Sequence, residues 1–489
     1  LLRSIAGGEH ATWLDSLVIL VAPIYNADGN DEVSVTNRAR QHGPLAGVGE
    51  RANAQGLDLN RDHMKLESAE ARSLVRLLAE YDPHVVVDLH TTNGTHHGYH
   101  LTYAPPLHPG TDPRILRLAR EAWLPELTRR LREATGWHSW HYGNAFTPEG
   151  GEPGWYTFDH RPRFNNNYVG LRNRVALLSE AYSYASFEDR VAVTLAFVEE
   201  ILDLASREAA AVRAATAAAD AEPLPETRLP LRAEMARGPE VEILMGEVEE
   251  RLNPISGRRY LARLPRAEPT RFRDYTSFAG TEIERVPAAY YVPAALEAVV
   301  DRLALHGVRM HRLSAATAAR VERFALDSSV VAEREFQGHR EREAFGRWRP
   351  ASTTLPEGTL VVPTAQPLGR LVFYLLEPRS DDGLLNWNVL DDALAADPDA
   401  YPVLRAAAGA TPPVAGPAGA GWAPMRVGTE AEFRGLSAAA GGVAWASGSG
   451  GVVATTADGG VTWRTLRIPG ADSLFLVGVR AADARTAHV

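Results

Sequence analysis

The chain has 489 residues, which favours two or three domains over one. With 45% hydrophobic and 23% charged residues, a formal net charge of -10 and no basic run, it is a globular chain that is not built to bind nucleic acid. It contains no cysteine, which excludes disulfides and cysteine-bound metal centres, and no apolar run long enough to span a membrane.

The first half of the chain alternates predicted strands with predicted helices. Residues 16–25 are apolar and rich in β-branched side chains, which is typical of a buried strand. A helix is predicted over 67–81, with Ser68 as its N-cap. The remaining predicted elements are strands over 85–90, 100–106 and 174–184 and helices over 112–135 and 187–220. This alternation is typical of an α/β sheet.

Composition changes divide the rest of the chain. A Pro-rich break over 221–230 precedes mixed strand and helix signals, and a tract rich in Ala, Pro and Gly follows them. We therefore predict four regions: an α/β domain over 1–220, an α+β domain over 231–400, a linker over 404–424 and a β-rich tail over 425–489.

The tail contains the stretch TTADGGVTW. Its Asp458, Gly460, Thr462 and Trp463 resemble the Asp-box of BNR-type β-propellers. Propellers close with four to eight blades, and the tail is long enough for about one. The resemblance therefore implies a partial propeller.

Four segments of the first half carry polar residues in places where chemistry is expected. They are TNRARQHGP (36–44), GLDLNRDHMK (56–65), VVVDLHTTNG (85–94) and RVALLSEAYSY (174–184). Glu180 interrupts an apolar strand, and a buried carboxylate must be compensated because an unpaired charge is costly. His90 ends another apolar strand, and ligand sites in α/β sheets form at the carboxyl ends of strands.

In this order and spacing, the four segments resemble the zinc carboxypeptidase family, the carboxypeptidase A-like metallopeptidases. The resemblance covers roughly residues 1–205 and includes PIYNADG, in which Ala27 replaces the proline of the family's Asn-Pro-Asp-Gly turn. It implies a mixed-sheet α/β/α domain, a bound Zn²⁺ and peptide or protein C-termini as substrates. It also implies export to the periplasm or the cell exterior.

The same resemblance implies roles for single residues. His90 would be a zinc ligand, and Glu180 would be the general base that takes a proton from a metal-activated water. Arg38 would polarise the scissile carbonyl, with Arg40 as the alternative because the alignment of that loop is ambiguous.

Further residues would bind substrate. Asn60 and Arg61 would grip the terminal carboxylate, which suits the planar fork of an arginine. The family also places a tyrosine on a loop before the general base, and Tyr156 and Tyr168 both lie in that segment. Arg163 lies there too and is a further candidate for substrate contact.

The sequence departs from the family pattern at one essential point. The His-x-x-Glu motif that supplies two zinc ligands does not occur in a suitable place, and GGEH (7–10) has its Glu before its His. We expect that motif upstream of Leu1. One imidazole cannot hold a catalytic zinc, so the chain as given is expected to be inactive on its own.

Two other functions fit the sequence. A zinc deacylase of N-acyl amino acids would share the metal core and an arginine for the carboxylate. A protein without catalytic activity would use the first domain to bind peptides and the tail to carry interactions.

Overall fold

The computed structural model describes residues 1–489 except 93, 399, 414–426, 440–442 and 458–461. The chain forms two compact units, Leu1–Ala415 and Gly416–Val489. The predicted Pro-rich break over 221–230 lies inside the first of these units.

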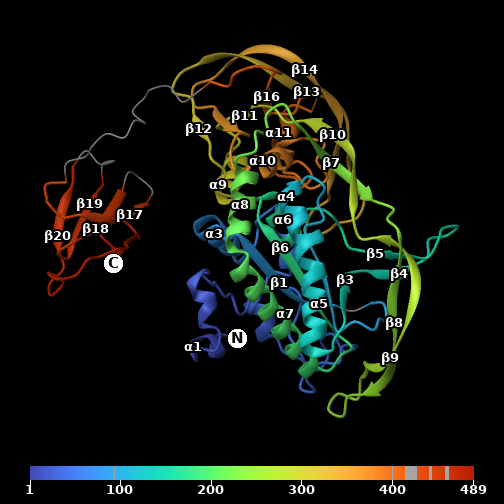
Figure 1. Cartoon of the computed structure of the whole chain (residues 1–489). Coiled ribbons are helices and arrows are strands. Elements are labelled where there is room, and N and C mark those ends of the chain that lie inside the picture. The colour runs from blue at the N-terminus through green and yellow to red at the C-terminus, as the bar shows by residue number, and fades with distance from the viewer. Residues whose placement is uncertain (93, 399, 414–426, 440–442, 458–461) are drawn as a thin grey trace. The chain divides into compact units, whose positions relative to one another are not determined.

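A four-stranded sheet lies at the centre of the first half (Figure 1). Its order is β1 (Val85–Thr92), β6 (Val175–Tyr182), β2 (Leu101–Ala104) and β3 (Ser139–His141). β1 runs parallel to β6, and β2 runs antiparallel to β6 and parallel to β3. The predicted strands near residues 85, 101 and 175 are confirmed, and the sheet is mixed.

Helices cover this sheet. The predicted helix near residue 69 is confirmed as α3 (Ala69–Tyr81), and the Ser68 hydroxyl accepts a hydrogen bond from the backbone N–H of Ala71 at 3.1 Å. The predicted helix over 112–135 is continuous, with a π-helical middle. The helices are α4 (Pro113–Leu116), the π-helical segment Arg117–Trp123, α5 (Leu124–Thr135), α6 (Asn165–Leu171), α7 (Phe187–Arg207) and α8 (Ala209–Asp220).

Alternate residues of β6 face two different cores. Val175 and Leu177 pack with side chains of α5 and α7, and Figure 1 shows these two helices side by side. Ala176 belongs to the opposite cluster, together with residues of α3 and α6. Because side chains alternate along a strand, Glu180 lies on the same face as Ala176.

The prediction of a strand over residues 16–25 is wrong. This stretch contains no strand, and Val18 is 89% exposed. Its apolar residues meet no sheet partner, because β1 pairs only with β6 among the described strands. The short helices around it are α1 (Leu2–Ala6) and α2 (Ala27–Asp31), with 3₁₀ turns at Ala11–Asp15 and Leu59–Arg61.

The second half of this unit is built on long antiparallel strands. A six-stranded sheet has the order β12-β15-β11-β16-β13-β14, the pair β7 and β10 stands apart, and β8 and β9 join β4 and β5. The strands are β4 (Asn144–Phe146), β5 (Gly154–Tyr156), β7 (Arg228–Met235), β8 (Glu240–Leu252), β9 (Arg259–Tyr275), β10 (Phe278–Arg285), β11 (Ala289–Val292), β12 (His311–Arg312), β13 (Thr317–Val331), β14 (Arg342–Leu355), β15 (Leu360–Pro363) and β16 (Leu404–Ala406). Its helices are α9 (Glu297–Leu305), α10 (Gly369–Leu376) and α11 (Asp391–Ala396).

One hydrophobic cluster joins the two halves. It contains Val75 and Tyr168 from the first half and Tyr290 and Phe373 from the second. Leu224, inside the predicted Pro-rich break, is buried in the same cluster. Residues 231–400 and 1–220 therefore share one hydrophobic cluster, and Leu224 anchors the connection between them in it.

The unit Gly416–Val489 contains a four-stranded antiparallel sheet in the order β17 (Phe433–Ala439), β18 (Val443–Gly448), β19 (Val452–Thr456) and β20 (Arg464–Arg467). Two short strands, β21 (Arg480–Ala481) and β22 (Ala487–His488), pair with each other. Asp458 and Gly460 of the Asp-box-like stretch, and most of the predicted linker, lie outside the described residues.

Across the described part of the chain, no helix combines the length and the apolar character needed to cross a lipid bilayer.

One ion pair between the two halves is predicted to make stability depend on pH. His339 Nε2 lies 2.8 Å from Glu67 Oε1. Burial raises the pKa of Glu67, but hydrogen bonds from His339 and Lys65 lower it overall to about 2. The hydrogen bond to Glu67 raises the pKa of His339 above 6.5. The Glu67 contribution is lost as the pH falls from 4.5 toward 2, and the His339 contribution is lost as the pH rises above 6.5.

Replacing His339 by Asn should therefore lower the free energy of unfolding by about 1 kcal/mol between pH 4.5 and 6.5, and by less at higher pH. Thermal unfolding of wild type and variant across the pH range measures the difference. An equal difference at pH 5 and at pH 9 would contradict this account.

Candidate active site

The pairing of β1 with β6 brings His90 and Glu180 together. The two residues are directly paired across the parallel strands, close to the ends of both. Asp88 shares their face, and its Oδ2 lies 2.9 Å from His90 Nε2. His90 and Glu180 are the two strand residues that the sequence indicated. They lie next to each other near the carboxyl ends of β1 and β6.

The charges at this position are strongly coupled. Burial raises the pKa of Glu180 to about 7, although the neighbouring His90 acts in the opposite direction. Burial lowers the pKa of His90, but the Asp88 carboxylate outweighs it and raises the value to about 9. Glu180 Oε2 is buried and finds no hydrogen-bond partner among the described residues. The carboxyl therefore has a free oxygen for a bound water or ligand.

Arg38 comes to this site on a loop that is tied to the end of β6. The backbone N–H of His42 donates to the carbonyl of Ser183 at 2.8 Å, immediately beyond that strand. Burial and the nearby Arg51 lower the pKa of Arg38, while the carboxylates of Asp58, Glu50 and Glu180 raise it, so Glu180 is one of three acidic groups that act on this guanidinium. Arg40 instead lies toward His96, whose pKa burial and the Arg40 charge lower.

Asn60 and Arg61 lie in the 3₁₀ turn that Asp58 caps. Asp58 Oδ1 accepts from the backbone N–H of Asn60 at 3.1 Å, and Arg61 Nη1 donates to the carbonyl of Asn60 at 2.7 Å. The Arg61 guanidinium stacks 3.9 Å from the centre of the Phe164 ring. The Asn60 side-chain oxygen accepts from the N–H of Asn165 at 3.0 Å. The turn is therefore fixed to the start of α6.

The two tyrosines occupy different places. Tyr156 stacks on Tyr275 with ring centres 4.4 Å apart, in the sheet that contains β5 and β9. Tyr168 is fully buried, and its hydroxyl lies 2.9 Å from His306 Nδ1. Within the described residues, the contacts of both side chains are with the protein core or a neighbouring sheet, and none of them joins His90 or Glu180.

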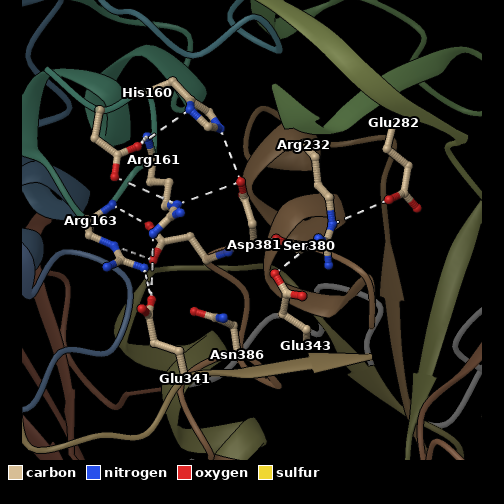
Figure 2. A network of polar contacts seen from close by, with 12 residues as sticks. His160, Arg161, Arg163, Arg232, Glu282, Glu341, Glu343, Ser380, Asp381 and Asn386 are labelled. Atoms are coloured by element: carbon tan, nitrogen blue, oxygen red, sulfur yellow. Dashed lines mark hydrogen bonds and ion pairs between the residues drawn. The ribbon is translucent and has the colours of Figure 1, made fainter. Parts of the chain in front are cut away.

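Arg163 is also engaged within the protein. Its backbone N–H and its Nε donate to Asp382 at 2.6 and 2.8 Å, and its guanidinium also pairs with Glu341. Figure 2 shows Arg161 and Arg163 both pointing toward Glu341. Arg163 is only 2% exposed. In this placement it holds two parts of the chain together.

Two residues at the site were missed in the sequence. Arg51 pairs with Asp58, its Nε lying 2.7 Å from Oδ2, and its charge acts on both Glu180 and His90. Burial and the Glu180 carboxylate raise the pKa of Tyr142, while the nearby Arg61 lowers it. The charges of both Glu180 and Arg61 therefore act on Tyr142, whose hydroxyl also hydrogen-bonds with Thr92 and Asn144. Tyr142 directly follows a short strand, which was a usable signal, but Arg51 stands in an irregular loop without any pattern.

A catalytic zinc takes three protein ligands. In the part of the chain that the structure describes, no three side chains of His, Cys, Asp or Glu come together to hold a metal ion. The His90 nitrogen that faces Asp88 is already paired with a carboxylate. The described residues therefore do not fit a complete catalytic zinc site.

Comparison with known proteins gives distant matches. No family model matches the chain, and no solved structure does. The chain is 24% identical to "Carboxypeptidase 2" of Trichophyton equinum over 416 residues, which are 81% of this chain and 70% of the relative. It is also 24% identical to "Carboxypeptidase 2" of Trichophyton tonsurans over 424 residues, with the same coverage. These distant relatives support a peptidase function at the level of the family.

Proposed function

We propose that the unit Leu1–Ala415 is a peptidase domain of the carboxypeptidase type that acts on peptide C-termini. The observation that carries the proposal is the direct pairing of His90 and Glu180 on adjacent strands, with the Arg38 and Arg51 charges acting on Glu180. A peptide that ends in a carboxylate is attracted to this group of arginines, and its last peptide bond then lies near Glu180. An exported protein would meet such peptides, and export is part of the proposal.

Arg61 is the residue we assign to the terminal carboxylate. Its Nη1 lies 4.0 Å from Asp58 Oδ2, which is longer than a hydrogen bond. Burial is the main reason that the pKa of Arg61 is lowered, so its charge is incompletely compensated. A carboxylate that binds both nitrogens of the fork would supply that compensation.

Glu180 is the residue we assign as general base. A base works best when its pKa lies near the working pH, and burial raises that of Glu180 to about 7. Its free Oε2 can accept a proton from a water. Arg38 is the cation available for the oxygen of the bond that is cleaved.

Zinc dependence is the finer part of this proposal, and His90 is the ligand that this chain would contribute. The described residues do not complete a metal site around His90. We expect the chain by itself to bind C-terminal peptides without hydrolysing them. Peptide binding without catalysis is thus the second function that the same observation favours.

The metal expectation is tested directly. After equilibration with Zn²⁺ and exhaustive dialysis, the chain should retain well below one equivalent of zinc by elemental analysis. A His90→Ala variant should retain the same small amount. One tightly held equivalent per chain that disappears in the variant would show that the described donors suffice after all.

Carboxylate recognition is tested with a blocked dipeptide that has a free C-terminus and with its C-terminal amide. Wild type should bind the acid more tightly by calorimetry. Arg61→Ala should weaken binding of the acid about tenfold to a hundredfold, because a charge-assisted hydrogen-bond pair is lost, and should leave binding of the amide unchanged. Arg213→Ala, at an exposed position of α8, is the matched control. Equal binding of acid and amide by wild type would end the proposal.

A further inference from the structure

The tip of the β13–β14 hairpin reaches the loop that carries Arg61. This hairpin tip consists of residues 336–341, and its turn is Gln337-Gly338. Phe336 and His339 pair across the turn, with backbone N to O distances of 2.7 and 3.0 Å. The tip thus contains a two-residue β-turn within the connection over 332–341 that joins the long strands β13 and β14.

Gln337 holds a conformation that suits another residue better. Its φ is +52°, and Gly338 has a φ of +79°. Two-residue turns of this kind favour Asn or Gly at the first position, because a left-handed backbone costs other residues about 1–2 kcal/mol. A residue in such a conformation persists only when surrounding contacts hold it there.

That contact joins the tip to the carboxylate-binding turn. The side-chain oxygen of Gln337 accepts a hydrogen bond from the backbone N–H of Asp58 at 2.9 Å, across 279 positions of sequence. Asp58 in turn caps Asn60, pairs with Arg51 and lies beside Arg61. A glycine at position 337 would relax the turn and would lose this contact.

The tip has a second attachment on the other side of Arg61. His339 pairs with Glu67, whose second oxygen accepts from Lys65 Nζ at 2.9 Å. Lys65 is buried and also pairs with Asp62 at 2.9 Å. Asp62 directly follows Arg61, so the two attachments bracket the arginine at positions 58 and 62.

A third attachment connects the hairpin tip to the segment that follows Arg61. Glu341 lies two residues beyond His339 in the chain and pairs with Arg163 (Figure 2). The backbone carbonyl of Arg163 lies 3.2 Å from His63 Nδ1. His63 stands two positions after Arg61, so this contact also ends at the segment that carries the guanidinium.

We propose that the hairpin tip is a positioning element for carboxylate binding, in which Gln337 fixes Asp58 and thereby sets the direction of the Arg61 guanidinium. This inference rests on the proposed function. Gln337 touches no substrate in this account and acts only through Asp58. The second half of the chain then controls how well the first half recognises a peptide C-terminus.

Gln337→Gly tests the inference, because it suits the turn and removes only the contact to Asp58. The probes are the blocked dipeptide acid and its amide, measured by calorimetry. The acid should bind about five- to tenfold more weakly than to wild type, as expected for one lost hydrogen bond. Binding of the amide and the melting temperature should not fall. Glu335→Gln, an exposed change on the same hairpin, should behave as wild type.

The outcomes separate the two proposals. If wild type prefers the acid and Gln337→Gly keeps the full preference, the positioning role is wrong and the proposed function stands. If wild type shows no preference, both proposals fail. Should Gln337→Gly not fold, Gln337→Asn also suits the turn and shortens the side chain that reaches Asp58, and an unchanged preference for the acid in that variant would overturn the inference.

Discussion

The parallel register of β1 and β6 is the constraint on which the site depends. It sets an imidazole and a carboxylate directly opposite each other on one face of the sheet. A shift of one residue would turn either side chain to the face that packs against α5 and α7. The register is held by side chains that alternate between two separate cores. The same alternation that builds the fold therefore places His90 beside Glu180.

The arginines come from loops, and each loop is fixed by contacts elsewhere in the chain. The Arg38 loop is tied to the end of β6 through Ser183, and the Arg61 turn is tied to α6 through Asn165. The β13–β14 hairpin adds contacts from more than 270 residues away. The second half of the unit is thus part of the site's support, which agrees with the hydrophobic cluster that both halves share.

The local elements of the first half could be predicted because their signals are local. Ser68 predicts the start of a helix, and the β-branched run before Asp88 predicts a strand. Both predictions are confirmed. Residues 16–25 carry an equally strong apolar signal but form no strand. A strand is stable only when it pairs with a neighbouring strand, and the local sequence does not show whether such a partner exists. The burial of Leu224, within the predicted break over 221–230, could not be read from the sequence either, because it arises from contacts with distant segments.

The site was predictable only where it lies on strands. His90 and Glu180 stand out because a polar residue at the end of an apolar run is unusual. Arg51 and Gln337 stand in irregular segments without such a pattern, and their contacts with Asp58 are visible only in the structure. The resemblance supplied Arg38, Asn60 and Arg61 as candidates. The structure adds a charge interaction between Arg38 and Glu180, and it places Tyr142 under the charges of both Glu180 and Arg61.

The central claim is that His90, Glu180 and Arg61 serve one bound peptide. A crystal structure with a blocked dipeptide acid tests it most directly. We expect the carboxylate of the dipeptide to pair with the Arg61 guanidinium and its last peptide bond to lie on the β1–β6 face next to Glu180. A dipeptide bound elsewhere, or one whose carboxylate turns away from Arg61, would contradict it.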